Sequence, residues 1–142
     1  MSDEQPHADV DAIFVYGTLR PGRERWPLIE DMVVDTQTAM MRGFEMYHLP
    51  DGYPAVVEGD GRITGELIWP VEGAREALLD KADRIENYIP GDDRSLYRRI
   101  VAGQGHARAF IYVYHPGRLD DLHNRGTPVP HGDWVRFVEE KP

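Results

Sequence analysis

Residues 13–22 read Ile13-Phe14-Val15-Tyr16-Gly17-Thr18-Leu19-Arg20-Pro21-Gly22, and the rest of the chain is interpreted around them. Four apolar residues in a row, with no breaker among them, predict a buried strand. Gly17 and Thr18 interrupt that strand, and Pro21-Gly22 prevents a simple continuation. A strand that stops at a glycine leaves backbone N–H groups without a ladder partner, and a bound carboxylate or phosphate is a suitable acceptor for them. The same residues are also compatible with a strand that ends in an ordinary turn.

Composition narrows the class of protein. The chain has 142 residues, 41% of them hydrophobic, which is typical of one folded globular domain. Sixteen basic against 25 acidic residues leave a net charge of −9, which argues against a nucleic-acid partner. No apolar run approaches the roughly 20 residues of a membrane helix, and no signal-like segment opens the sequence, so we expect no membrane partner and a cytoplasmic location. The absence of cysteine excludes thiol chemistry.

Periodicity and turn residues predict the order of the elements. We expect a disordered tail over residues 1–11, followed by a single domain over residues 12–142. Helical turns are predicted at 23–31, one helix at 72–87 and a hairpin turn at 58–62, and the segment 116–142 is rich in glycine, proline and charge. Strands are predicted at 13–16, 32–41, 42–49, 53–57, 63–69, 97–102 and 107–114. Many short strands with one helix predict an α+β fold with a small barrel-like sheet.

The predicted helix carries a carboxylate on its apolar side. Its apolar residues recur at steps of four, four and three, at Ala74, Leu78, Ala82 and Ile85. On a helical projection Glu86 lies within the same arc, whereas the other acidic residues point away from it. Burial would raise the pKa of Glu86 toward neutrality, as a general acid–base requires. The alternative is a structural role, in which Glu86 forms an ion pair with Arg98 or Arg99 at the end of the helix.

Other kinds of site find little support in the sequence. The six histidines lack the paired spacing of zinc sites, and no calcium-loop pattern is present. The glycine-rich segments lack a phosphate-loop lysine, and no serine nucleophile motif occurs. We therefore expect no metal ion and no cofactor.

Several segments together resemble the γ-glutamylcyclotransferase-like (AIG2-like) family. Phe14–Gly22 resembles the opening motif of this family. Further matches follow in order at Gly43, Tyr53-Pro54-Ala55, Gly65-Glu66-Leu67, Asp83-Arg84-Ile85-Glu86, Tyr97-Arg98-Arg99, Ala109–Tyr114 and Gly132-Asp133-Trp134. One departure is Asn87, where many relatives have glycine. Because asparagine also tolerates the left-handed conformation, we expect the helix to end in the same way.

The resemblance implies a small mixed β-barrel with flanking helices and a cavity at the Tyr16–Leu19 loop. It implies that the backbone of this loop holds the carboxylate end of a small-molecule γ-glutamyl substrate. The general acid–base would then be Glu86, and the product 5-oxoproline, without a metal or cofactor. The site residues expected on this basis are Tyr16, Gly17, Thr18, Leu19, Glu86 and, as a second polar contact, Tyr97.

Two other functions are compatible with the same residues. A non-catalytic module could keep the cavity and bind a small molecule without turnover. A γ-glutamyl hydrolase could use Glu86 to activate water. The sequence leaves the departing amine open among amino acids, lysine side chains, polyamines and natural-product amines, and it leaves the oligomeric state open.

Overall fold

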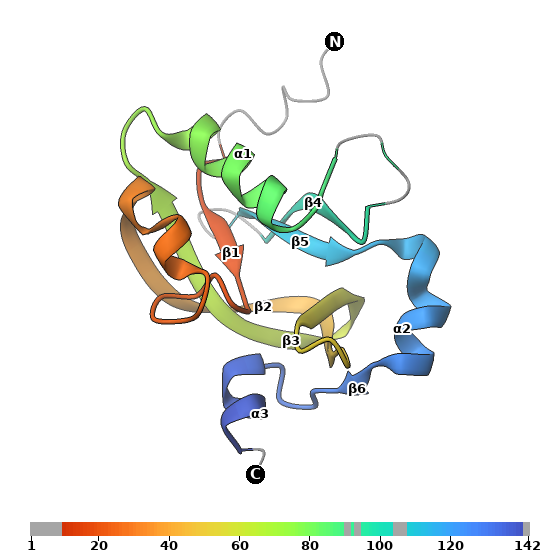
Figure 1. The fold of residues 1–142 in the computed structure, drawn as a ribbon. Coiled ribbons are helices and arrows are strands. Elements are labelled where there is room, and N and C mark those ends of the chain that lie inside the picture. Colours follow the sequence, from red (N-terminus) through yellow and green to blue (C-terminus); the bar gives the residue numbers. More distant parts are fainter. Residues whose placement is uncertain (1–9, 90–91, 93–94, 104–107, 141–142) are drawn as a thin grey trace.

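A six-stranded mixed sheet curls into a half-barrel with three flanking helices (Figure 1). The computed structural model describes residues 10–89, 92, 95–103 and 108–140. Its strands are β1 (Ile13–Val15), β2 (Val33–His48), β3 (Pro54–Pro70), β4 (Tyr97–Ala102), β5 (Ala109–Tyr114) and β6 (Thr127–Pro128). Its helices are α1 (Arg75–Ile85), α2 (Leu119–Arg125) and α3 (Trp134–Glu140), with 3₁₀ turns at Trp26–Leu28, Glu30–Met32 and Pro116–Arg118. The expected α+β class and mixed, barrel-like sheet are confirmed.

The strand order is β4-β5-β1-β3-β2-β6, which places the short β1 in the middle of the sheet. β1 runs parallel to β5 and antiparallel to β3, whereas the other pairs are antiparallel. β1 is therefore paired with a neighbouring strand on each of its edges. Its C-terminal end leads directly into the Gly17 loop.

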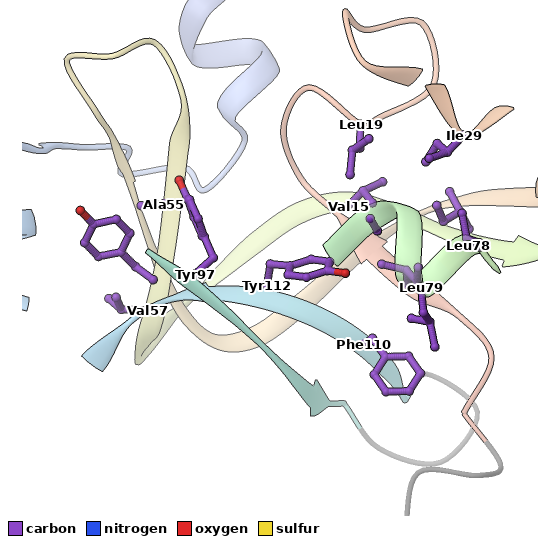
Figure 2. Packing of buried hydrophobic residues seen from close by; sticks show 14 of the residues in the cluster. Val15, Leu19, Ile29, Ala55, Val57, Leu78, Leu79, Tyr97, Phe110 and Tyr112 are labelled. Atoms are coloured by element: carbon purple, nitrogen blue, oxygen red, sulfur yellow. The ribbon is translucent and has the colours of Figure 1, made fainter. Parts of the chain in front are cut away.

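Side chains on the two faces of β1 enter two different hydrophobic clusters. Ile13 and Val15 pack in one cluster together with α1. Phe14 lies in the other cluster, which contains Trp134 of α3. All six residues of β5 are buried, so this strand is covered on both faces. Figure 2 shows the first cluster, with side chains of α1, β4 and β5 converging on it.

One long hairpin replaces four predicted strands. β2 and β3 pair along nearly their whole length, so the predicted turn at 58–62 is wrong. The pairing shifts register between Arg42 and Phe44, opposite the glycines that suggested a turn. A Cβ on Gly61 would lie 2.9 Å from the carbonyl oxygen of Phe44, and one on Gly59 would overlap the side chain of Glu45. These glycines accommodate close contact between two strands at an irregularity, instead of reversing the chain.

The ends of the domain differ from the predicted boundaries. Val10 is buried in the first cluster, and its carbonyl accepts a hydrogen bond from Arg75 Nε at 2.9 Å. The core thus begins two residues before the expected boundary at residue 12, while residues 1–9 of the expected tail lie outside the described residues. The segment after residue 116, which is rich in glycine, proline and charge, contains α2, β6 and α3. Among the described residues, no helix combines the length and the apolar character needed to cross a membrane.

Candidate active site

A cavity of about 170 Å³ opens between the end of β1, the end of α1 and the start of β4. All six residues expected at a site lie around it, namely Tyr16, Gly17, Thr18, Leu19, Glu86 and Tyr97. The loop is separated from Glu86 by nearly 70 residues of sequence, so the fold brings together two features that were inferred independently. Their chemical roles remain predictions.

The loop after β1 lines the cavity and has backbone N–H groups without a partner among the described residues. The carbonyls of Gly17 and Thr18 accept hydrogen bonds from the backbone N–H groups of Arg20 and Arg25, at 3.1 and 2.9 Å. The N–H groups of Gly17, Thr18 and Leu19 donate no hydrogen bond to any described residue. A loop with N–H groups of this kind suits an anion.

Gly17 is also required by packing. A Cβ built on this residue would lie 2.7 Å from Cγ of Pro54, which forms the opposite wall of the cavity. Any side chain at position 17 would therefore displace either the loop or Pro54. The same proline offers its carbonyl to the hydroxyl of Tyr97, which donates to it at 2.8 Å. Loop, proline and tyrosine thus fix one another around the cavity.

Arg20 connects three of the segments that carry the family resemblance. Its Nη2 lies 3.2 Å from Oε1 of Glu66, and its Nη1 lies 3.0 Å from Oδ1 of Asp133. All three side chains are largely shielded from water, so these ion pairs are screened less than surface pairs. Arg20 therefore anchors the loop after β1 to β3 and to the start of α3.

Helix α1 ends in a way that directs Glu86 into the cavity. The N–H of Asn87 donates to the carbonyl of Arg84 at 3.2 Å, and that of Tyr88 to the carbonyl of Asp83 at 2.9 Å. Asn87 has a φ of 55°, so the expected left-handed helix end is confirmed. This pattern is a Schellman motif, with Glu86 as the last residue before the chain turns away.

Asp83 fastens the same helix end to the sheet. Its two carboxylate oxygens lie 2.8 and 2.7 Å from Nη1 of Arg99 on β4, and Tyr112 on β5 donates its hydroxyl to Oδ1 at 2.6 Å. Arg99 therefore pairs with Asp83 and not with Glu86, and Arg98 is exposed. The alternative in which Glu86 is the ion-pair partner of either arginine is wrong.

Tyr112 also connects Asp83 to the loop. While its hydroxyl binds Asp83, its backbone carbonyl accepts a hydrogen bond from the hydroxyl of Tyr16 at 2.5 Å. In Figure 2, Tyr97 and Tyr112 project from neighbouring strands into the same cluster. The chain of contacts fixes the relative position of the helix end and the loop.

Burial dominates the electrostatics of the Glu86 carboxyl group. Burial of its carboxyl raises the pKa of Glu86 to about 7, while the positive charge of Arg25 acts in the opposite direction. No described residue forms an ion pair or a hydrogen bond with this carboxylate. Burial also raises the pKa of Tyr16 and of Tyr97, so both phenols stay protonated at neutral pH. A carboxyl group with a pKa near 7 can both accept and donate a proton there.

Three residues at the mouth of the cavity were not among the expected site residues. Arg25, Asp51 and Tyr53 line it, although the region around Arg25 reads only as scattered charge. Their positions depend on how the segments before β2 and β3 fold back over the loop. Within the described residues, no group of three His, Asp or Glu side chains is placed to hold a metal ion.

Comparison with known proteins agrees with this geometry. Residues 13–136 match the model of the family described as gamma-glutamyl cyclotransferase, AIG2-like. The chain belongs to this family. Among curated AIG2-like relatives, the gamma-L-glutamyl-butirosin B gamma-glutamyl cyclotransferase of Niallia circulans is 29% identical over 141 residues, covering 91% of this chain and 83% of that protein. A protein of Halalkalibacterium halodurans assigned as a gamma-glutamylcyclotransferase is 32% identical over 100 residues. The match covers 66% of this chain and 83% of that protein.

Solved structures share this fold over most of the chain. A protein from Pyrococcus horikoshii superimposes with a TM-score of 0.62 at 21% identity, covering 92% of this chain and 94% of that one. An AIG2-like protein from Mus musculus gives a TM-score of 0.59 at 21% identity, covering 77% and 82%. At this level of identity the likeness establishes the fold.

Proposed function

We propose that this AIG2-like protein converts a γ-glutamyl amine or amide into 5-oxoproline and releases the free amine, with Glu86 as general acid–base. The observation that carries the proposal is the position of Glu86. A carboxyl group with a pKa near 7 lines the same small cavity as a loop whose backbone N–H groups suit a carboxylate. The names of the curated relatives give independent support for the reaction class.

The proposed reaction begins with binding of the γ-glutamyl group. Its α-carboxylate accepts hydrogen bonds from the N–H groups of the loop from Gly17 to Leu19. The oxygen of Tyr97, which already donates to Pro54, accepts a hydrogen bond from the α-ammonium group. These contacts hold the chain of the substrate in a folded conformer, which supplies much of the rate in an intramolecular reaction.

Glu86 then transfers protons from the attacking nitrogen to the departing nitrogen. Its carboxylate takes a proton from the α-ammonium group, and the free amine attacks the γ-carbonyl carbon to form the new C–N bond of the ring. Protonated Glu86 gives this proton to the nitrogen of the departing amine as the original amide bond breaks, and the carboxylate then takes the second proton from the ring nitrogen. That second proton also passes to the departing amine, which leaves as an ammonium ion. The two protons lost by the α-ammonium nitrogen are thus the two gained by the departing nitrogen, and the steps need no metal ion, so the rate should survive treatment with EDTA.

Product analysis tests the proposal against its two rivals. The purified protein is incubated with a panel of γ-glutamyl compounds, including γ-glutamyl-α-amino acids, γ-glutamyl-ε-lysine, γ-glutamyl polyamines and γ-glutamyl-butirosin B. Formation of 5-oxoproline with an equal amount of free amine supports cyclotransfer. Free glutamate would instead indicate a hydrolase, and binding without any product would indicate a binding module.

A further inference from the structure

The charged residues around the cavity are unevenly distributed. Among the described residues that line it, only Arg25, Asp51 and Glu86 carry ionisable acidic or basic side chains. Glu86 lies at the C-terminal end of α1, and Asp51 is exposed at the rim of the cavity. Arg25 is half-buried, and its charge lowers the pKa of Glu86, which places the guanidinium within electrostatic reach of the carboxyl group.

Arg25 is held in position without a carboxylate partner. Its Nη2 donates to the hydroxyl of Tyr53 at 2.9 Å, and its guanidinium carbon lies 4.8 Å from the centre of the Tyr53 ring. Its backbone N–H binds the carbonyl of Thr18, so the residue is attached to the loop. No carboxylate of the described residues forms an ion pair with it. A guanidinium has five N–H donors in a rigid fork that matches a carboxylate, and most of those of Arg25 remain available.

The position of Arg25 relates it to the departing amine. Tyr16 and Tyr97 make the buried inner part of the cavity, whereas Tyr53 and Leu96 are 37% and 39% exposed and mark its mouth. In the proposed reaction the glutamyl group occupies the inner part, and Glu86 hands its proton to the departing nitrogen. The remainder of the departing amine must then extend toward the mouth, where Tyr53 holds Arg25. A cavity of about 170 Å³ is well below the roughly 300–1,000 Å³ of sites that enclose drug-sized ligands, so this remainder lies partly outside.

We propose that Arg25 determines specificity by binding a carboxylate on the departing amine, close to its nitrogen. This inference rests on the proposed function and names the substrate class, a γ-glutamyl compound whose departing amine is acidic. Asp51 would favour a cationic amine instead. Its carboxylate is exposed to water, which weakens its interactions, whereas Arg25 is half-buried and its charge acts on Glu86.

The test compares substrates that differ in one charge. γ-Glutamyl-alanine carries a carboxylate next to the departing nitrogen, γ-glutamyl-alaninamide has a neutral group of the same shape, and γ-glutamyl-ethylenediamine carries a positive charge. For the wild type we expect kcat/KM for the alanine compound to exceed that for the alaninamide by about 10-fold or more. A charge-assisted hydrogen bond between Arg25 and the carboxylate accounts for a difference of this size. In Arg25→Met this preference should disappear, because only the alanine compound loses an interaction.

Two further variants separate specificity from a structural effect. Arg25→Lys keeps the charge and should restore part of the preference. Arg84→Met removes an arginine of α1 that is exposed and paired with Asp80, and it should leave the preference unchanged. Equal losses on the alanine and alaninamide compounds in Arg25→Met would overturn the proposal, because Arg25 would then serve the glutamyl group or the fold. A wild-type preference for the cationic compound would also overturn it.

Binding measurements keep this inference separate from the proposed function. If none of the three compounds yields 5-oxoproline, their affinities are compared by isothermal titration calorimetry. Tighter binding of γ-glutamyl-alanine that is lost in Arg25→Met would support the carboxylate site while contradicting the cyclotransferase activity. Equal affinity for all three compounds, or no binding of any, would contradict the carboxylate site.

Discussion

The guanidinium of Arg99 on β4 lies 2.8 and 2.7 Å from the two carboxylate oxygens of Asp83 on α1. This ion pair joins the last turn of the helix to the sheet three residues before Glu86. It leaves Glu86 without either of the arginine partners that a structural role would require. The carboxyl group that is proposed to move the proton is therefore positioned by its neighbour and is not itself part of the ion pair.

Replacing Asp83 should affect both stability and rate. Asp83→Asn removes the charge that binds Arg99 and weakens the contact with Tyr112, at a cost of roughly 2 kcal/mol in the free energy of unfolding. Because the end of α1 is then less well fixed, kcat should fall by roughly 10- to 100-fold while KM changes less. Urea unfolding and steady-state kinetics measure the two effects.

Asp80→Asn is the matched control for this prediction. Asp80 lies on the same helix and pairs with Arg84 on the exposed surface, with Oδ2 and Nη2 2.8 Å apart. Exposed pairs of this kind contribute about 0.5 kcal/mol or less, so this variant should resemble the wild type. Similar losses in the two variants would contradict a special role for Asp83.

The loop after β1 should bind substrate through its backbone more than through its side chains. Gly17→Val should abolish binding, since even a Cβ at this position would lie 2.7 Å from Pro54 and a larger side chain would displace the loop. Thr18→Ala keeps the backbone and should weaken binding only modestly. Calorimetric titration with a γ-glutamyl compound, carried out in a Glu86→Gln background to prevent turnover, compares the two. Equal and small effects would count against backbone recognition.

The rate should depend on pH through Glu86. Burial raises the pKa of Glu86 to about 7, and the proposed first step requires the unprotonated carboxylate. We therefore expect kcat/KM to fall by about tenfold for each pH unit below that value. Arg25→Met removes the positive charge that lowers this pKa, so it should shift the acidic limb to higher pH. A profile that is flat between pH 5 and 8 would contradict the assignment.

The raised pKa of Glu86 should also make the stability of the protein depend on pH. The rate is expected to rise with pH, whereas the contribution of Glu86 to stability should fall. Because the pKa of Glu86 in the folded protein lies above its ordinary value of 4.5, the folded state holds the proton more tightly than the unfolded state. The contribution of Glu86 to stability is therefore greatest below about pH 4.5 and declines as the pH rises toward 7. Glu86→Gln lacks this decline, so its Tm relative to the wild type should increase over the same range. A Tm difference that does not change with pH would contradict burial of an ionisable Glu86.

Parts of the fold could be predicted because their signals are local. The buried strand at Ile13–Val15, the helix around Leu78 and the strand Ala109–Tyr114 each have an apolar pattern that matches the element. The long hairpin could not be predicted, because Gly59 and Gly61 are typical of a turn and only the opposing strand reveals why they occur. Helices α2 and α3 have seven residues and one buried side chain each, too few for a periodic signal.

Some residues of the candidate site could likewise be predicted from the sequence, and others could not. The glycine that ends a buried strand and the carboxylate within an apolar arc are both visible in the sequence, so the loop and Glu86 could be predicted. The contact between Arg25 and Tyr53 could not, since it depends on how the segments before β2 and β3 fold over the loop. The arrangement of side chains at the mouth of the cavity is thus a property of the tertiary structure.

The most direct test of the account is the behaviour of one variant, Glu86→Gln, in which shape and volume are nearly unchanged. Thermal unfolding and 5-oxoproline formation are measured on the same preparation. We expect a folded protein whose rate is at least about 10²- to 10⁴-fold lower, the contribution of general acid–base catalysis, and whose affinity for substrate changes far less. Undiminished turnover by a well-folded Glu86→Gln protein would contradict the central claim, and the structure would then account only for a fold and a cavity.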